Sequence, residues 1–529
     1  MSKIKKVIFW MCLAIMVLST ILVKPLLDLD EIWNFNVARS IANGLLPYKD
    51  VTTIVTPLLS FIVAGILKIF GSELIVTRIL AAILAMVNLS LIYKILKKAK
   101  VNELVAHATV LLVAIVFKDY FCLDYNFFVV TLGLIVMLLE IKYFDSNKKR
   151  HQIIIGILGG LAICTKQTIG ILICSVIIVN KFYFIKNKSD FKNVCKKCLY
   201  RIIGISIPIV IFVIYLLVTR SVESFMDYCV WGISTFNNKK PYFDLIKGKK
   251  VVAGFAIAVP IIIAISIVEN IWFKIKKNEK SNFYTLTFYC LPILLIVYPI
   301  ADEIHMLIAS IPTIILFGYV VNQLIKIILP KIKVKMHKYI VEFASIAITL
   351  AVVFLTGYVE IKNTDALSDL SKYKEINHFK YIIIDKSIRN TIKDVDEYIL
   401  SQDKEVYVLD SRSAVYRIPI DKYTKDFDVF LVGNLGAGGE EKQIERIKNT
   451  DAKYLILSKT NGLNWQTPLK VREYVLENME KVDSVNAFDV YENKAKETTE
   501  ENSNDGQKDE EQSKEENNEK NAEADQIEN

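Results

Sequence analysis

The sequence predicts a polytopic α-helical membrane protein with a small extracytoplasmic α/β domain and a disordered acidic C-terminal tail. Three observations lead to this fold class. Hydrophobic residues make up 53% of the 529-residue chain, and the mean hydropathy is +0.36. These residues gather in runs of about 17–22, the length at which a helix crosses roughly 30 Å of bilayer hydrocarbon. The composition then changes near Glu360 and again after Tyr491.

About 11 apolar segments fall within residues 1–359, which form the predicted membrane domain. The first segment begins like a signal peptide, but it is too long and lacks a small-residue cleavage site, so we expect a retained helix. The long run at 152–182 must cross and return, with a turn near Lys166 and Gln167. The segments fall at 7–27, 52–70, 74–93, 101–117, 125–142, 152–182, 201–218, 251–269, 282–299, 304–325 and 338–357.

Lysine and arginine gather in short clusters between these apolar segments. The positive-inside rule places such clusters in the cytoplasm, and it explains the formal charge of +9 without nucleic-acid binding. The protein is thus expected in the cell membrane, with its N-terminus cytoplasmic and loops 28–50 and 219–250 extracytoplasmic. The clusters are Lys3 to Lys6, Lys94 to Lys100, Lys148 to Arg150, Lys186 to Arg201, Lys274 to Lys280 and Lys326 to Lys338.

One segment does not fit this alternation. With loop 28–50 outside, full crossings at 52–70 and 74–93 would put the cluster at 94–100 outside as well. We therefore expect segment 52–70 to dip into the membrane and return, or to lie partly at its surface. A proline near its start and a glycine after its end permit this path.

Residues 360–495 alternate strand-like and helix-like runs, which predicts a small α/β domain, and an odd number of net crossings puts it outside the cytoplasm. Residues 496–529 are too polar to bury a core and are predicted to be disordered. The expected strands are Val406–Leu409, Val429–Val432 and Tyr454–Leu457, and the expected helices are Ser387–Leu400, Glu441–Lys448 and Leu469–Met479.

Two patterns that resemble ligand sites are assigned no function. Cys195 and Cys198 form a CxxC pair, but no second pair or nearby histidine completes a zinc site. The glycine-rich run 433–439 lacks the lysine and the spacing of a nucleotide-binding loop, so it is expected to be a plain turn.

Three carboxylates, Asp28, Asp30 and Glu31, follow the first apolar segment at the predicted outer surface. Carboxylates this close repel each other, so one takes up a proton or the group shares a cation. Such an arrangement suits a general base or a metal ligand. The alternative is a helix end that acidic side chains anchor in water.

A lysine interrupts the apolar run 159–170, which reads GGLAICTKQTIG. A charged side chain within the membrane costs roughly 2.5–3.5 kcal/mol, so Lys166 is expected to face a wet cavity or an anionic ligand, with Gln167 beside it. The alternative is a lysine that extends from a helix end to the membrane surface.

Two further outer turns carry polar side chains. Asp124 and Asn126 open one apolar segment, while Asp302 and His305 precede another. A histidine beside carboxylates can bind phosphate as a cation, accept a proton or ligate a metal, whereas alone it would be a capping or interfacial residue. With Lys166 and the first-loop acids, these residues predict a site for an anionic headgroup and for a nucleophile that must lose a proton.

Several motifs in this order resemble the GT-C glycosyltransferases. The similar branch contains protein O-mannosyltransferases, aminoarabinose transferases and rhizobial galacturonosyltransferase-like membrane proteins. The resemblance covers most of residues 1–325. The motifs are DEIW (30–33), ARSIANGLLPYKD (38–50) and TPL (56–58) in the first outer loop, GGLAICTKQTIG (159–170) and YPIADEIH (298–305).

The resemblance implies a GT-C-like membrane domain that transfers a sugar from a polyprenyl-phosphate donor to an extracytoplasmic acceptor, which is a cell-envelope glycan, a lipid or a protein. The implied catalytic residues are Asp30, as the base for the acceptor hydroxyl, and Glu31 beside it. The implied substrate-binding residues are Asp28, Asp124, Asn126, Lys166, Gln167, Asp302 and His305.

The sequence also departs from the family pattern. The Lys-Pro-Pro or His-Pro-Pro sequence of some relatives is only Thr56-Pro57 here, so a phosphate contact expected at that position is not carried over. No His/Glu set reproduces the metal site suspected in some relatives. No cofactor is therefore assigned, and a requirement for a divalent metal ion stays open.

Two other functional classes remain. A transporter or flippase of lipid-linked saccharides would also use intramembrane lysines and outer carboxylates, but its site would lie near the midplane. A non-catalytic membrane assembly protein would use the outer domain and the acidic tail as interaction surfaces. The concentration of polar residues at one face favours the transferase.

Overall fold

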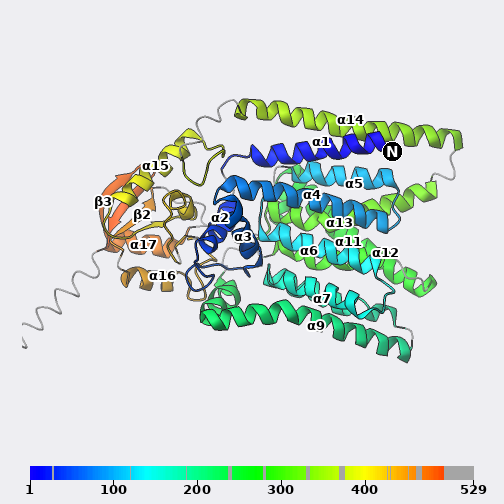
Figure 1. The fold of residues 1–529 in the computed structure, drawn as a ribbon, viewed down its shortest axis with the longest axis horizontal. Helices are drawn as coiled ribbons and strands as arrows, with labels where there is room; N and C mark the ends of the chain where they lie inside the picture. The colour runs from blue at the N-terminus through cyan, green and yellow to red at the C-terminus, as the bar shows by residue number, and fades with distance from the viewer. Residues whose placement is uncertain are drawn as a thin grey trace, which may run out of the picture.

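The computed structural model describes residues 1–26, 29–118, 121–185, 187–235, 241–277, 282–298, 300–328, 334–367, 376–425, 427–428, 430–450, 452–459 and 467–493. Seven helices within these ranges are long and apolar enough to cross a membrane. They lie side by side as a bundle, with a small sheet-containing domain at one end (Figure 1). We call this the domain end, and we call the opposite end, where the N-terminus lies, the far end.

The helices of the bundle follow the predicted apolar segments, so the predicted fold class is confirmed. Large apolar side chains along α9, α11 and α14 are exposed, as expected for surfaces that face lipid, whereas α6 and α13 are mostly buried. The bounds are α1 (Lys3–Leu22), α4 (Leu74–Lys98), α5 (Glu103–Phe117), α6 (Tyr125–Lys142), α7 (Lys149–Ile163), α8 (Gln167–Val179), α9 (Lys188–Thr219), α11 (Lys250–Lys277), α12 (Asn282–Leu294), α13 (Glu303–Ile328) and α14 (Val334–Leu367).

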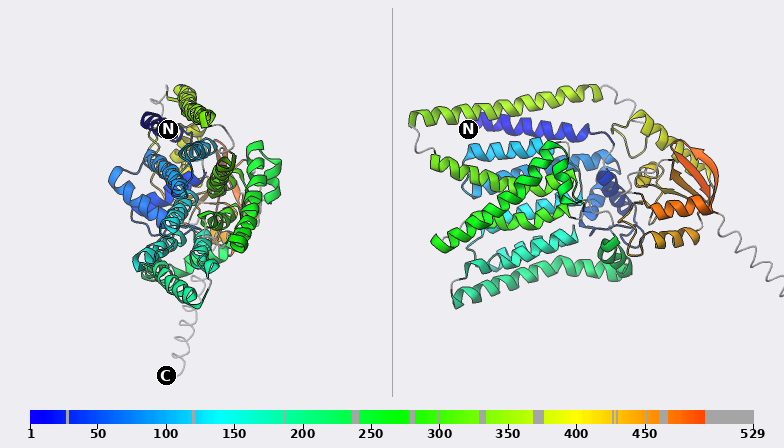
Figure 2. Two further views of the ribbon diagram at one scale, coloured as in Figure 1. Left: turned by 90° about the vertical axis from the view of Figure 1, so that its right-hand side faces the viewer. Right: turned by 180° about the vertical axis from the view of Figure 1, so that it is seen from behind.

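Where the structure describes them, the cationic clusters share the far end of the bundle. Lys6 pairs with Glu103 at the start of α5, and Lys5 pairs with Glu342 near the start of α14. Seen from behind, the bundle again has the N-terminus at one end and the small domain at the other (Figure 2, right). The common location of these clusters is what the positive-inside pattern predicts.

Helix α3 (Leu58–Phe70) does not reach the far end. Its 13 residues span only about 20 Å. Its first amide, Leu58 N, donates to Cys164 O at 2.9 Å at the domain end of α7. Just beyond its last turn, Glu73 pairs with Lys380 of the small domain. Segment 52–70 therefore starts and ends on one side, which agrees with the charge pattern of the sequence.

The predicted turn in segment 152–182 separates α7 from α8 at residues 164–166. The break is tight: a Cβ on Gly170 would lie 2.3 Å from the backbone of Ile163. Gly156 and Gly160 let α7 approach the backbone of α9 equally closely, the small-residue packing that membrane helices use. Lys166 is consequently held at a rigid corner of the domain end.

A buried ion-pair cluster fixes the far end of the bundle. Glu140 of α6 contacts Arg201 of α9 at 2.6 Å and Lys181, after α8, at 3.0 Å. Arg201 Nε also donates to Gln152 of α7 at 2.8 Å. Because one buried carboxylate joins side chains from α6, α9 and the end of α8, we assign this cluster a role in fixing the helices relative to one another.

The small domain contains a four-stranded sheet in the order β1-β2-β4-β3, with β1 and β2 parallel and the other neighbours antiparallel. Two predicted strands and all three predicted helices of this domain are present. Its elements are α15 (Lys386–Ser401), β1 (Val406–Leu409), α16 (Gly439–Lys448), β2 (Tyr454–Ser458), α17 (Leu469–Asn478), β3 (Glu480–Val485) and β4 (Phe488–Glu492).

The strand expected at 429–432 is wrong in its described part, because residues 430–432 form a turn. Phe430 and Leu431 are buried in the domain instead of pairing with a neighbouring strand. The chain then turns at Gly433 and Gly436, both with positive φ. The sequence also gave no signal for β3, which is polar and largely exposed. The predicted tail at 496–529 lies outside the described residues.

Helix α2 (Leu29–Ala42) is fixed to the bundle by a buried fork. Arg78 of α4 donates from Nε to Glu31 Oε1 at 2.9 Å and from Nη2 to Oε2 at 3.0 Å. Its remaining donors reach the carbonyl oxygens of Lys24 and Pro25, at the turn before α2. Arg78 is fully buried and Glu31 nearly so, which makes this pair hard to break singly.

We predict that Arg78→Met lowers the free energy of unfolding by about 3–5 kcal/mol, because it leaves the Glu31 carboxylate buried without its cation. Titration with a denaturing detergent in mixed micelles would measure this. The double variant Glu31→Gln/Arg78→Met should recover part of the loss. Lys247→Met, which removes an exposed ion pair with Asp244, should change stability by about 0–1 kcal/mol. Equal losses for the two single variants would contradict the proposed anchor.

Asp396 is a buried carboxyl group of α15, outside the bundle. Burial, with a smaller contribution from Glu397, raises the pKa of Asp396 to about 8. The unfolded chain releases this proton near pH 4. The contribution of Asp396 to the stability of the domain is therefore fully present below about pH 4, and it is lost as the pH rises through about 8.

We predict that Asp396→Asn stabilises the domain at pH 8.5 by up to a few kcal/mol and flattens its pH dependence between pH 5 and 8.5. Hydrogen exchange of α15 peptides in the detergent-solubilised full chain would report this. Asp394→Asn, at an exposed position on the same helix, is the matched control. An unchanged pH dependence in Asp396→Asn would contradict the assignment.

Candidate functional site

One face of α2 supports the small domain. Its four contact residues are spaced by three, three and four positions, so they lie on one side of the helix. Arg39 is fully buried, and its guanidinium also stacks 4.5 Å from the ring of Tyr423. The contacts are Trp33 Nε1 to Ser411 O at 3.4 Å, Asn36 Nδ2 to Asp428 Oδ2 at 3.2 Å, Arg39 to Asp421, and Asn43 Nδ2 to Tyr423 OH at 2.6 Å.

A second attachment holds the opposite edge of the domain. The π-helical turn η2 (Met226–Trp231) presents Asp227, which accepts from Ala437 N at 2.8 Å and pairs with Lys442 at 2.7 Å. Gly436 faces this carboxylate so closely that a Cβ would lie 2.9 Å from it. The glycine-rich run is thus a docking turn.

Lys166 lies at the centre of the predicted site. Its Nζ donates to Asn126 Oδ1 at 2.6 Å and lies 5.1 Å from the ring centroid of Tyr125. The carboxylates of Asp124, Asp30 and Asp302 are all close enough to act on its charge. Lys166 therefore contacts Asn126 and Tyr125 directly and lies within electrostatic reach of three carboxylates from distant parts of the chain.

The neighbours of Lys166 are held by helix ends. Asp124 Oδ1 accepts from Phe127 N at 2.7 Å and caps the first turn of α6, which places Asn126 beside the lysine. Gln167 Nε2 donates to Ile54 O at 3.0 Å and to Cys229 O at 3.1 Å. Gln167 consequently ties loop 50–55 to η2 at the edge of the site.

Asp302 and His305 form a local pair at the start of α13. Asp302 Oδ1 accepts from His305 N at 2.9 Å and lies 2.7 Å from His305 Nδ1. Neither side chain is fully buried, since 27% and 18% of their side-chain surfaces are exposed. The carboxylate therefore orients the imidazole.

Asp30 and Glu31, predicted together, have different surroundings. Asp30 is partly exposed in the first turn of α2, and its charge acts on Lys166 and on Tyr125. Glu31 is the carboxylate that Arg78 holds, so it points to the bundle and fixes the helix that carries Asp30. Asp28 lies outside the described residues.

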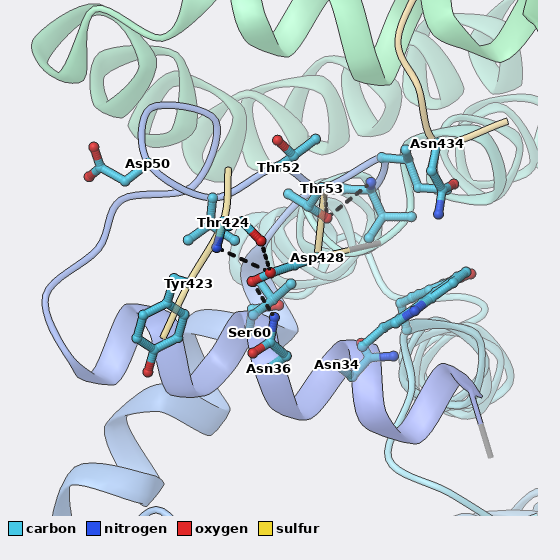
Figure 3. Close-up of a pocket in the computed structure, with 16 residues that line it drawn as sticks. Asn34, Asn36, Asp50, Thr52, Thr53, Ser60, Tyr423, Thr424, Asp428 and Asn434 are labelled. Carbon is cyan, nitrogen blue, oxygen red and sulfur yellow. Dashed lines mark hydrogen bonds between the residues drawn. The ribbon is translucent and has the colours of Figure 1, made fainter. Parts of the chain in front are cut away.

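A cavity of about 50 Å³ that is partly open to solvent lies between α2, loop 50–55 and the domain loop 423–434. Tyr125 lines it, so it adjoins the Lys166 cluster. Figure 3 shows Asn434 extending from the domain loop on the side that faces α2, with Thr424 and Asp428 on the same wall. These domain residues were not predicted, because neither spacing nor local composition links them to α2.

Among the described residues, no group of three or more His, Cys, Asp or Glu side chains is arranged to hold a metal ion. The sequence left a requirement for a metal ion open, and the described residues do not provide a set of ligands for one.

The sequence and the fold were compared with known proteins. The sequence model of the dolichyl-phosphate-mannose-protein mannosyltransferase family matches residues 54–218. No curated protein sequence matches the chain. The family match at residues 54–218 includes Lys166 and Asp124 but not α2 or the small domain.

Two crystal structures of ArnT from Cupriavidus metallidurans share the fold over nearly the whole chain. The structure bound to undecaprenyl phosphate covers 93% of this chain and 98% of its own, with a TM-score of 0.56 and 12% sequence identity. The apo structure gives a TM-score of 0.55 with the same identity and coverage. Over nearly its whole length, the chain therefore has the fold of these ArnT structures, and residues 54–218 match the mannosyltransferase family model.

Proposed function

We propose that this protein transfers a sugar from a polyprenyl-phosphate donor to a hydroxyl-bearing acceptor at the domain end, on the extracytoplasmic side of the cell membrane. The observation that carries the proposal is the meeting of Lys166 with Asp30, Asp124 and Asp302 beside a cavity under the small domain. The shared fold with an ArnT that was crystallised with undecaprenyl phosphate supports the choice of donor.

Lys166 is assigned to the donor phosphate. Its ammonium lies at the end of a membrane helix pair, where a phosphate on a lipid chain would sit at the same depth. Asn126 accepts one hydrogen bond from it, and its other donors are free to turn to the ligand. As the sugar leaves, negative charge grows on the phosphate oxygen, and a fixed cation there stabilises the transition state more than the ground state. His305, oriented by Asp302, is a second donor for the same phosphate.

Asp30 is assigned as the general base. The acceptor oxygen forms a bond to the anomeric carbon of the donor while the bond from that carbon to the phosphate oxygen breaks. The electron pair leaves with the polyprenyl phosphate, and the hydroxyl proton moves to the Asp30 carboxylate. Glu31 has a supporting role here, because its fork with Arg78 sets the direction of the first turn of α2.

We predict that Asp30→Asn lowers transfer by about 10²–10⁴-fold and leaves the folded protein intact, because this partly exposed side chain contributes little to the core. A deletion strain complemented with each variant would be tested by mass spectrometry of polyprenyl-phosphate sugars and envelope glycans. Asp244→Asn, an exposed carboxylate outside the site, should complement fully. Normal transfer by Asp30→Asn would remove Asp30 from the mechanism.

We predict that Lys166→Met weakens binding of undecaprenyl phosphate at least tenfold, because a charge-assisted contact is lost. Native mass spectrometry of the protein in nanodiscs would measure the bound fraction. Lys68→Met removes an exposed lysine at the end of α3 and should bind as well as the unmodified protein. Equal binding by Lys166→Met would contradict the assignment of this lysine to the phosphate.

The deletion strain also separates the transferase from the two other classes. Accumulation of the lipid-linked donor at the outer leaflet, with loss of one sugar from an envelope polymer, supports the transferase. Accumulation at the inner leaflet supports a transporter, and an unchanged profile supports an assembly protein.

A further inference from the structure

The cavity between α2 and the small domain has a chemistry of its own. Its described lining residues include three aromatic side chains, several hydroxyl groups and three amides, but no lysine, arginine or histidine. The aromatic residues are Trp33, Tyr125 and Tyr423. Rings of this kind provide flat, amphipathic contact surfaces. The wall therefore combines flat apolar surface with neutral hydrogen-bonding groups.

Two buried amides in this wall have polar atoms without a partner among the described residues. Asn434 is only 4% exposed, yet neither its Oδ1 nor its Nδ2 has a hydrogen-bond partner among the described residues. Asn36 is 1% exposed, and its Oδ1 is likewise unpartnered within the described part of the chain. Leaving such groups buried without partners costs free energy, and a ligand that pairs with them recovers it.

The charges in the wall do not favour an anion. The Asp428 carboxylate accepts from Asn36 and from both Thr424 donors, and Arg417 lies 3.7 Å behind it. Asp50 caps its own turn by accepting from Leu46 N at 2.9 Å. A phosphate or carboxylate would meet these two acids without a lining cation, whereas hydroxyl groups can both donate to and accept from the amides.

The cavity is also next to the proposed reaction centre. Tyr125 forms part of its lining, and the same ring lies 5.1 Å from Lys166 Nζ. The charge of Asp30 acts on this tyrosine as well. A molecule in the cavity therefore lies beside the tyrosine that also neighbours Lys166.

We propose that this cavity binds a neutral sugar moiety, with Asn434 of the small domain and Asn36 of α2 as its specificity-determining contacts. The inference rests on the proposed function for the source of that sugar. The sugar is either part of the acceptor or the one that the donor carries. It assigns the small domain a direct part in substrate choice.

Direct binding is tested with the full chain in nanodiscs, because alkyl-glycoside detergents would compete for the cavity. Saturation-transfer NMR with methyl glucoside, methyl galactoside, methyl mannoside and methyl N-acetylglucosaminide is compared with methyl glucuronide and glucose 6-phosphate. We expect at least one neutral glycoside to bind about tenfold or more tightly than either charged compound. Binding confined to the charged compounds, or none by any neutral glycoside, would overturn the proposal.

The contacts are tested by substitution. Asn434→Ala should weaken the neutral glycoside about tenfold, and Asn434→Asp, which keeps the shape but adds a charge, should weaken it as well. Without ligand, Asn434→Ala should be as stable as the unmodified protein or more so, because it removes an unpaired buried amide. Asn478→Ala, at an exposed asparagine of the same domain, should bind normally. Full binding by both Asn434 variants would refute the assigned contact.

Transfer kinetics then identify the source of the sugar. A raised KM for the acceptor with an unchanged KM for the donor assigns the cavity to the acceptor, and the reverse assigns it to the donor sugar. Glycoside binding that depends on Asn434 in a protein without transfer activity would uphold the cavity and remove the proposed function. If the protein transfers sugar but neither KM changes in Asn434→Ala, the proposed function stands and the proposed role of the cavity is wrong.

Discussion

The structure depends on the attachment of α2 to two bodies at once. The Glu31–Arg78 fork holds this short helix against the bundle, and the Arg39 and Asn36 contacts hold the small domain against the helix. The Glu31–Arg78 fork and the Asn36–Asp428 contact are buried, so each is costly to break by removing one partner. A helix of only 14 residues could not be positioned by propensity alone. The direction of α2, and the cavity between it and the small domain, follow from these two attachments.

Charge is divided around Tyr125. On one side Lys166 provides a cation among carboxylates, and on the other the cavity offers amides, hydroxyls and rings. A group-transfer reaction between an anionic leaving group and a neutral nucleophile uses both environments, a cation for the phosphate and neutral groups for the hydroxyl-bearing substrate. Tyr125 adjoins both of them.

Hydrophobic periodicity, and the free-energy cost of a charged side chain in the membrane, were sufficient to predict features that depend on consecutive residues. The apolar segments, the corner at Lys166 and the helices of the small domain could be predicted because each reflects a property of consecutive residues. Sequence spacing could not show that Glu31 faces Arg78, since the two meet only when α2 folds back on α4. The same holds for Asn434, whose importance comes from a wall completed by α2. The strand expected at 429–432 failed because apolar side chains also fill the interior of turns. The assignments of Asp30, Lys166 and His305 to individual steps remain predictions.

The two-edge attachment of the small domain has a mechanical consequence. Asp227 with Lys442 and Ala437 fixes one edge, and the α2 contacts fix the other. Because the small domain is attached at two places, it cannot rotate about a single hinge without first breaking one of these sets of contacts. Entry and exit of a substrate are therefore expected to proceed by movement of the loops that line the cavity, without displacement of the whole domain.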